Sequence, residues 1–143
     1  MGAATNLIAF AQEPRIAAVF SDSAFVDLSE LIDDELQSMR LPTFLSYGGY
    51  FMARIVGGED LRVHSPREGI IKDAGRPLYL VHGTADQRVG FHQNRELAAL
   101  AQQSGANATF WVVENAGHVE SVFHSPGEYE QRMSGFFRAA LGR

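Results

Sequence analysis

The segment RPLYLVHGTADQRV, residues 76–89, is the clearest indication of fold class in this chain. Residues 76–83 are almost continuously apolar, which is typical of a strand whose two faces are both buried. Pro77 stands at the start of this run, where a strand tolerates the missing N–H group. The residues that follow form a polar segment that contains Asp86. The stretch therefore predicts a buried strand over 76–83 that ends in a loop carrying a carboxylate.

Two more short apolar runs predict further strands, one on each side of this stretch. They are RIAAVF, Arg15 to Phe20, and ATFWVV, Ala108 to Val113. Apolar residues at helical spacing predict helices over residues 3–12, 26–39, 93–104 and 126–141. Helices that alternate with fully apolar strands indicate an α/β fold, with a short parallel sheet of about three strands covered by helices on both faces. At 143 residues the chain fits one domain, residues 1–143.

The segment FLSYGGYFMARIVGGEDL, residues 44–61, is less regular than the rest. Its two Gly–Gly pairs, at 48–49 and 57–58, are predicted to bracket a short helix. Its aromatic side chains are Phe44, Tyr47, Tyr50 and Phe51. They either cover one end of the core or line a pocket for a small molecule, and the sequence leaves both interpretations open.

Composition and charge exclude several kinds of partner. The net charge is −5 and the basic residues are scattered singly, so no nucleic-acid-binding surface is predicted. The absence of cysteine excludes disulfides, thiolate metal sites and a cysteine nucleophile. The sequence has no run of about 18 apolar residues, so no membrane span is predicted. The N-terminus lacks the pattern of a signal peptide, so the cytoplasm is the expected location.

The histidines do not show the paired helical spacing of a metal site. They are His64, His82, His92, His118 and His124. His82 belongs to the end of the predicted buried strand and is therefore interpreted as a structural residue rather than a metal ligand. Neither a metal ion nor another cofactor is predicted.

Two titratable residues are expected to meet at one edge of the sheet. The strand over 76–83 runs into the loop of Asp86, and the strand over 108–113 runs into ENAGHVES, the loop of His118. Ligand sites of open parallel sheets lie beyond the carboxyl ends of the strands. A carboxylate that accepts a hydrogen bond from a histidine fixes its tautomer and stabilises the imidazolium. Asp86 and His118 are therefore the candidate catalytic residues.

Three stretches together resemble the C-terminal part of the α/β-hydrolase superfamily, in its serine esterase and peptidase branch. They are RPLYLVHGTADQRV, FWVVENAGHVES and PGEYEQRMSGFFRAAL. RIAAVFSDSAFVDL and SPREGI also fit, so the resemblance covers nearly the whole chain. It implies a truncated α/β-hydrolase fold, with Asp86 as the triad acid, His118 as the triad base and a small-molecule carboxylic ester as substrate.

The same resemblance places the nucleophile just outside this sequence. The family's serine sits in a G-x-S-x-G turn between a strand and a helix, commonly followed by small residues as in S-M-G-A-A-T. The chain begins MGAATNLIAF, so Met1 and Gly2 match the two positions after that serine. The strand leading into the turn and one oxyanion-hole loop are then expected to be absent. Four serines are weighed as substitutes, although each has a simpler explanation as a turn or cap residue: Ser21, Ser23, Ser121 and Ser125.

Three functions follow as hypotheses. The first is an esterase that uses Asp86 and His118 with a substitute serine, a serine from a partner chain, or water. The second is an inactive hydrolase fragment that persists as an oligomer, and the third is a small-molecule binding module built on residues 44–51.

The resemblance also predicts an oligomer. Without the strand that pairs with it in the family, the strand from Arg15 to Phe20 is an apolar, unprotected edge. A two-fold homodimer that pairs two such edges is therefore predicted.

Overall fold

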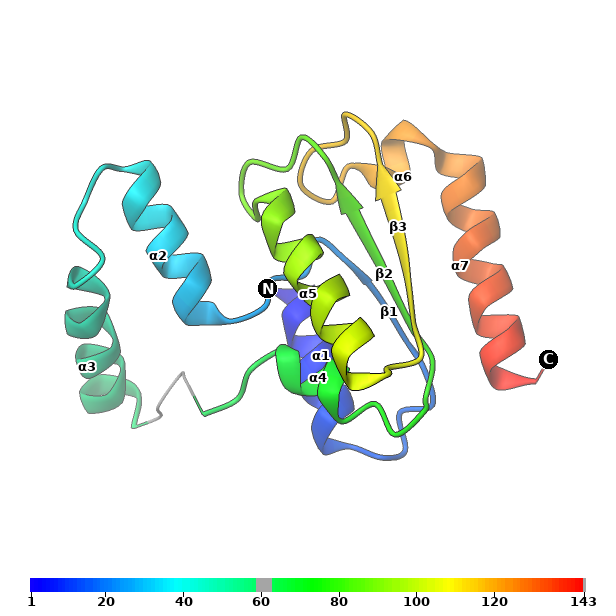
Figure 1. Ribbon diagram of the computed structural model, residues 1–143, viewed down its shortest axis with the longest axis horizontal. Coiled ribbons are helices and arrows are strands. Elements are labelled where there is room, and N and C mark those ends of the chain that lie inside the picture. Colours follow the sequence, from blue (N-terminus) through cyan, green and yellow to red (C-terminus); the bar gives the residue numbers. More distant parts are fainter. Residues whose placement is uncertain (59–62, 143) are drawn as a thin grey trace.

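The computed structural model describes residues 1–58 and 63–142, and in these residues the strands form one parallel sheet. Its middle strand is β2 (Leu78–Gly83), with β1 (Val19–Asp22) on one side and β3 (Ala108–Val113) on the other (Figure 1). Leu78 lies opposite Val19 in β1 and opposite Ala108 in β3. The predicted architecture, a short parallel sheet with helices on both faces, is confirmed.

The side chains of β2 supply the centre of the core on both faces of the sheet. All six residues of the strand are buried. Leu78 and Leu80 join the cluster on one face, and Tyr79 and Val81 join the cluster on the other. Successive side chains of a strand point to opposite faces, so a strand buried on both needs a continuous apolar run.

Three helices cover the face of the sheet that Leu78 and Leu80 occupy. They are α1 (Gly2–Gln12), α4 (Arg67–Ile71) and α5 (Phe91–Ser104). Each contributes a fully buried side chain to the same cluster: Leu7, Ile70 and Leu97. The helix predicted over 93–104 begins two residues earlier and ends at Ser104 as predicted. Gly105 follows it, and its φ of +69° is the left-handed conformation that favours glycine after a helix end.

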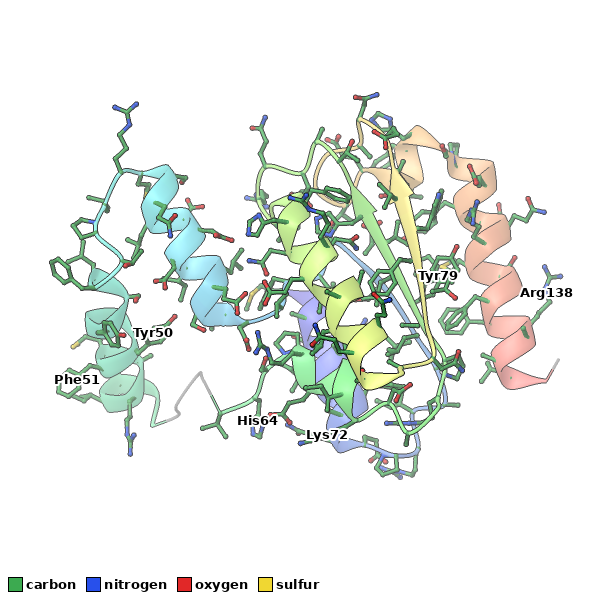
Figure 2. The ribbon with its side chains drawn as sticks, in the orientation of Figure 1. Tyr50, Phe51, His64, Lys72, Tyr79 and Arg138 are labelled. Carbon is green, nitrogen blue, oxygen red and sulfur yellow. The ribbon has the colours of Figure 1, made fainter. Side chains whose placement is uncertain are left out.

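On the opposite face lie α6 (Ser121–His124) and the long helix α7 (Pro126–Leu141), whose bounds were predicted correctly. Tyr79 extends from β2 toward α7 (Figure 2). Its ring stacks on Phe20 with centroids 5.1 Å apart, and Phe20 meets Tyr129 of α7 edge to face at 5.4 Å. None of the helices in the described residues combines the length and apolar character needed to cross a bilayer.

The remaining helices, α2 (Leu28–Ser38) and α3 (Leu45–Gly57), form a hairpin that projects to one side of the sheet and its helices (Figure 1). The interpretation that the aromatic side chains of this segment cover one end of the core fails for three of the four, because Phe44, Tyr47 and Phe51 are exposed and only Tyr50 is buried. The first Gly–Gly pair lies inside α3 rather than before it. The end of the predicted segment, residues 59–61, lies outside the described residues.

The prediction of a strand from Arg15 to Phe20 is wrong in its bounds, since β1 begins only at Val19 and ends at Asp22. Arg76 accounts for the difference. Its guanidinium donates hydrogen bonds to the carbonyl oxygens of Phe10 (2.8 Å), Glu13 (3.2 Å) and Ile16 (2.9 Å). Of these carbonyls, that of Ile16 lies inside the predicted strand, so it is not available for sheet pairing, and the edge strand has four residues.

Helices α1 and α4 pack so closely that one position on α4 must be glycine. A Cβ built on Gly69 would lie 2.4 Å from the carbonyl oxygen of Leu7, which is backbone and cannot rotate away. By contrast, a Cβ on Gly135 in the middle of α7 meets nothing within 4 Å. Of these two helical glycines, only Gly69 is required by packing.

We expect Gly69→Ala to lower the free energy of unfolding by about 1–3 kcal/mol, since the added methyl group forces α1 and α4 apart. Gly135→Ala is the matched control and should raise it by about 0.5–1 kcal/mol, because alanine has the higher helix propensity and its Cβ finds open space there. Urea unfolding followed by circular dichroism measures both. Equal changes in the two variants would contradict the packing argument.

Candidate active site

Asp86 lies in a tight turn directly after β2, and the backbone of that turn binds its carboxylate. Oδ1 accepts hydrogen bonds from the N–H groups of Arg88 and Val89, each at 2.9 Å. The side chain is completely buried. Two backbone donors on one oxygen fix the carboxylate, which leaves Oδ2 directed at the loop after β3.

His118 comes from that loop, and its Nδ1 lies 2.9 Å from Oδ2 of Asp86. The imidazole is 23% exposed, so one side of the ring is open. An ionised carboxylate can only accept hydrogen bonds, so Nδ1 carries the proton and donates it. Nε2 then keeps a lone pair that can take a proton. The structure thus brings together the two residues that the sequence selected from separate loops.

The hydrogen bonds to Asp86 also determine its protonation. Burial by itself would raise the pKa of Asp86, because desolvation disfavours the charged form. The bonds from the Val89 N–H, from His118 and from the Arg88 N–H outweigh burial and hold the pKa of Asp86 below its ordinary value. Asp86 is therefore ionised at neutral pH and can stabilise a positive charge on His118.

The two loops that carry Asp86 and His118 touch at the level of the backbone. A Cβ on Gly83 would lie 2.1 Å from the carbonyl oxygen of Ala116. That oxygen accepts a hydrogen bond from the N–H of Ala85 at 3.0 Å. Glycine at the end of β2 is what permits this approach, and the approach sets the separation of Asp86 from His118.

A second link joins the His118 loop to the end of β1. The N–H of Val119 donates to Oγ of Ser23 at 3.2 Å, and Ser23 donates to Oδ1 of Asp22 at 3.1 Å. Ser23 and Val119 have φ of +58° and +59°, a region that a β-branched residue such as valine rarely adopts. This hydrogen bond therefore holds together two segments that are both in strained conformations.

Asp22, the last residue of β1, is the residue at this edge that sequence reasoning missed. Burial raises the pKa of Asp22, and the hydroxyls of Ser23 and Tyr129 offset the increase only in part. Burial and the charge of Asp22 in turn raise the pKa of Tyr129 to about 12. The available signal in the sequence is an acidic residue directly behind an apolar run, a pattern that also fits an ordinary turn.

A cavity of about 290 Å³ opens beside His118. Its lining includes His118, Val119, Asp22 and Ser23, together with the start of α1 at Met1 and Gly2. Residues from β1, from α1 and from the loop after β3 therefore converge on one space. The open side of the imidazole borders this space, and so does the half-buried carboxylate of Asp22, whose pKa is raised.

The structure separates the four candidate serines into two pairs. Ser21 and Ser23 line the cavity, but Ser21 donates to the carbonyl oxygen of Ala3 at 2.9 Å and Ser23 donates to Asp22. Ser121 is completely buried, and Ser125 lies at the start of α7 without a side-chain capping bond. In the described part of the chain, none of the four hydroxyls forms a hydrogen bond with His118.

The other histidines have their own surroundings. His82 is buried, with Nε2 2.8 Å from the carbonyl oxygen of Val89 and 3.5 Å from Oδ2 of Asp86. His64 contacts Gln12, and His92 contacts Asp34. Across residues 1–58 and 63–142, no group of three or more histidine, aspartate or glutamate side chains is arranged to hold a metal ion.

Comparison with known proteins identifies one family. The model of the prolyl oligopeptidase family matches residues 2–143. No curated protein sequence matches the chain.

Solved structures of similar fold include hydrolases of several kinds. An esterase from Pyrococcus furiosus has a TM-score of 0.66 and 19% identity, with 96% of this chain and 49% of that chain covered. An acylaminoacyl peptidase from Pyrococcus horikoshii has a TM-score of 0.67 and 19% identity, covering 96% and 22%. A truncated carbohydrate esterase from gut microbiota has a TM-score of 0.62 and 22% identity, covering 90% and 44%.

These likenesses show the fold. Together with the family match over residues 2–143, they confirm the predicted resemblance to α/β-hydrolases. The chain spans about half the length of the similar esterases and a smaller part of the peptidase.

The buried carboxylate of Asp86 and the half-buried carboxylate of Asp22 predict opposite pH dependences of stability. Asp86 has a lowered pKa in the folded state, so its contribution is present above the unfolded value of about 3.9 and is lost as the pH falls through the folded value. Asp22 has a raised pKa, so its charge destabilises the fold as the pH rises through the folded value.

We expect the stability advantage of the unsubstituted protein over Asp86→Asn to grow between about pH 3 and pH 6. Over the same range, Asp22→Asn should gain stability relative to the unsubstituted protein. Urea unfolding of the three proteins at several pH values measures both differences. A dependence of the same sign for the two variants would contradict the assignment.

Proposed function

The chain belongs to the prolyl oligopeptidase family, and we propose that it hydrolyses small carboxylic esters with His118 as general base and Asp86 as its orienting carboxylate. The observation that carries the proposal is the 2.9 Å hydrogen bond between Nδ1 of His118 and Oδ2 of Asp86. An imidazole held in this way keeps Nε2 unprotonated and gains stability when it becomes charged.

In the proposed reaction, Nε2 of His118 takes the proton of a hydroxyl group as its oxygen bonds to the ester carbonyl carbon. Asp86 stabilises the imidazolium while the tetrahedral intermediate exists. The carbonyl then re-forms, and the alcohol leaves with the proton from Nε2. If the hydroxyl belongs to water, the products are the acid and the alcohol. If it belongs to a serine, a second round with water releases the acyl group.

The cavity beside His118 is the proposed position of the nucleophile. Met1 and Gly2, which match the two positions after the serine in the resembled motif, line this cavity together with His118. The hydroxyls of Ser21 and Ser23 already donate to Ala3 and Asp22. We therefore propose water, or a serine from a partner chain, in preference to these two.

Esters suit this arrangement better than amides do. An alcohol leaves more readily than an amine, so ester hydrolysis needs less acceleration. A general base without a preorganised oxyanion hole supplies only part of the acceleration of acyl transfer. The similar structures include esterases and an acylaminoacyl peptidase, so transfer of an acyl group is the shared chemistry.

One alternative is supported by a specific observation. None of the four candidate serines in the described residues hydrogen-bonds His118, which also fits an inactive hydrolase that persists as an oligomer. A binding module built on Phe44, Tyr47 and Phe51 lacks such support, because these side chains are exposed. The cytoplasmic location, and the correspondence of residues 1–143 to the C-terminal part of a hydrolase, stay predictions.

We expect His118→Ala to lower the rate of p-nitrophenyl acetate hydrolysis at least about 100-fold, because the general base is lost. Asp86→Asn should lower it at least about tenfold, because asparagine can stabilise the wrong tautomer. His124→Ala, which removes an exposed histidine six residues away, is the matched control and should keep the rate. Hydrolysis unchanged by His118→Ala would rule out the mechanism.

Labelling with a fluorophosphonate then separates the two sources of the nucleophile. Stoichiometric labelling of a serine that depends on His118 indicates a covalent route, whereas turnover without labelling indicates water. A protein that neither labels nor turns over the ester would support the inactive alternative.

A further inference from the structure

Helix α3 presents a broad apolar face that no other described part of the molecule covers. The residues of this outer face are 54–79% exposed: Phe44, Tyr47, Phe51, Met52, Ile55 and Val56. At 100° per residue they occupy about half of the helix circumference, and Gly48 falls among them. Figure 2 shows Phe51 on the side of α3 that faces away from the rest of the molecule.

The opposite side of α3 packs against its own hairpin. Ser46 and Tyr50 are the buried residues of the helix. The side of α3 that carries Ser46 and Tyr50 therefore holds the helix in the hairpin, and the outer face is not needed for that contact. A helix with Gly48 and Gly49 in its interior has little intrinsic stability, because each glycine costs about 1 kcal/mol relative to alanine. Packing of the outer face would offset that cost.

The hairpin is attached in a way that opposes folding back onto the sheet. Oδ2 of Asp34 in α2 lies 2.9 Å from Nε2 of His92 and accepts a hydrogen bond from Nε2 of Gln93 at 2.8 Å. Gln93 is completely buried, and its Oε1 accepts a bond from the N–H of Val26 at 2.9 Å. Arg67 adds ion pairs to the start of α2. These contacts hold α2 against α5, so the outer face of α3 stays turned away from the core.

A membrane surface fits this hairpin poorly. Helices that lie in a bilayer interface are rich in lysine and arginine on their polar side. The polar side of α2 is acidic, since this helix carries Glu30, Asp33, Asp34 and Glu35 and no basic residue, and the rest of the hairpin adds only Arg40 and Arg54. The whole chain has a net charge of −5. Anionic headgroups would repel it.

We propose that the outer face of α3 binds the same face of a second copy of this chain. A two-fold interface requires a surface that is complementary to itself. A Cβ on Gly48 or Gly49 would meet nothing within 4 Å, so the two glycines leave a shallow notch between the aromatic side chains. In an antiparallel crossing, Phe51 of each copy can enter the notch of the other, as ridges enter grooves in helix packing.

The size of the face agrees with this partner. An aromatic side chain carries roughly 150–250 Å² of surface, and three of them are more than half exposed. With the three aliphatic residues, the face approaches the roughly 800 Å² that each partner buries in a standard protein interface. The edge of β1, on which the sequence-based dimer prediction rests, offers only four residues.

Sedimentation velocity over a wide concentration range tests the proposal with three variants of the full chain. Phe51→Glu places a charge at the centre of the face and should weaken dimerisation at least about thirtyfold. Phe123→Glu makes the same change at a residue of α6 that is 80% exposed and should leave the dimer unchanged. Ala18→Lys, beside the β1 edge, should also leave it unchanged. Because Phe51 and Phe123 are exposed, neither substitution should alter the thermal unfolding of the monomer.

The absence of cysteine in the chain allows an independent test by cross-linking. Near a two-fold axis a residue faces its own counterpart. Gly48→Cys should therefore form a disulfide-linked dimer under mild oxidation at protein concentrations where Phe123→Cys stays monomeric. The cross-link should disappear when Phe51→Glu is added.

Three results would overturn the proposal. One is a protein that stays monomeric at every concentration. Another is a dimer that Ala18→Lys dissociates and Phe51→Glu does not, which would assign the interface to β1. The third is a monomer that binds vesicles of phosphatidylcholine and phosphatidylserine through Phe51, which would assign the face to a membrane.

Discussion

The close passage of two loops at Gly83 and Ala116 is the constraint on which the candidate site depends. β2 ends at Gly83, and the absence of a side chain there lets the carbonyl oxygen of Ala116 approach to a distance that a Cβ would forbid. That same oxygen accepts the N–H of Ala85, so the contact is both steric and hydrogen-bonded. Since both loops begin at parallel neighbouring strands, the contact brings a carboxylate and an imidazole together from positions 32 residues apart.

The environment then distinguishes two carboxylates at the same edge of the sheet. Both are desolvated, which raises the pKa of an acid. Asp86 receives two backbone N–H groups and His118, and these outweigh burial. The carboxylate of Asp22 is stabilised mainly by hydroxyl groups, and these do not outweigh the effect of burial on its pKa. Asp86 is therefore suited to stabilise a positive charge on His118, and Asp22 holds the neighbouring loop through Ser23.

Features that depend on local sequence patterns were predicted correctly, whereas features that depend on contacts between distant residues were not. The bounds of β3 and α7 were predicted correctly, because their apolar patterns are continuous and their ends are marked by turn residues or proline. β1 was placed too early, because Arg76, 60 residues away, takes the carbonyl of Ile16 inside the predicted strand. The direction of the aromatic side chains at 44–51 stayed open in the sequence, because an apolar helix pattern does not indicate which of its sides is covered; the structure buries Tyr50 and exposes Phe44, Tyr47 and Phe51.

The sequence by itself determined the parallel α/β sheet, the family resemblance and the placing of Asp86 and His118 at one edge. These depend on periodicity and on which loop follows which strand, and both can be read along the chain. The tertiary structure alone decided the start of β1, the raised pKa of Asp22, the engagement of Ser21 and Ser23, and the direction of the apolar face of α3. Each of these depends on which groups distant in the sequence come within contact distance, because hydrogen bonding, desolvation and packing act through space rather than along the chain.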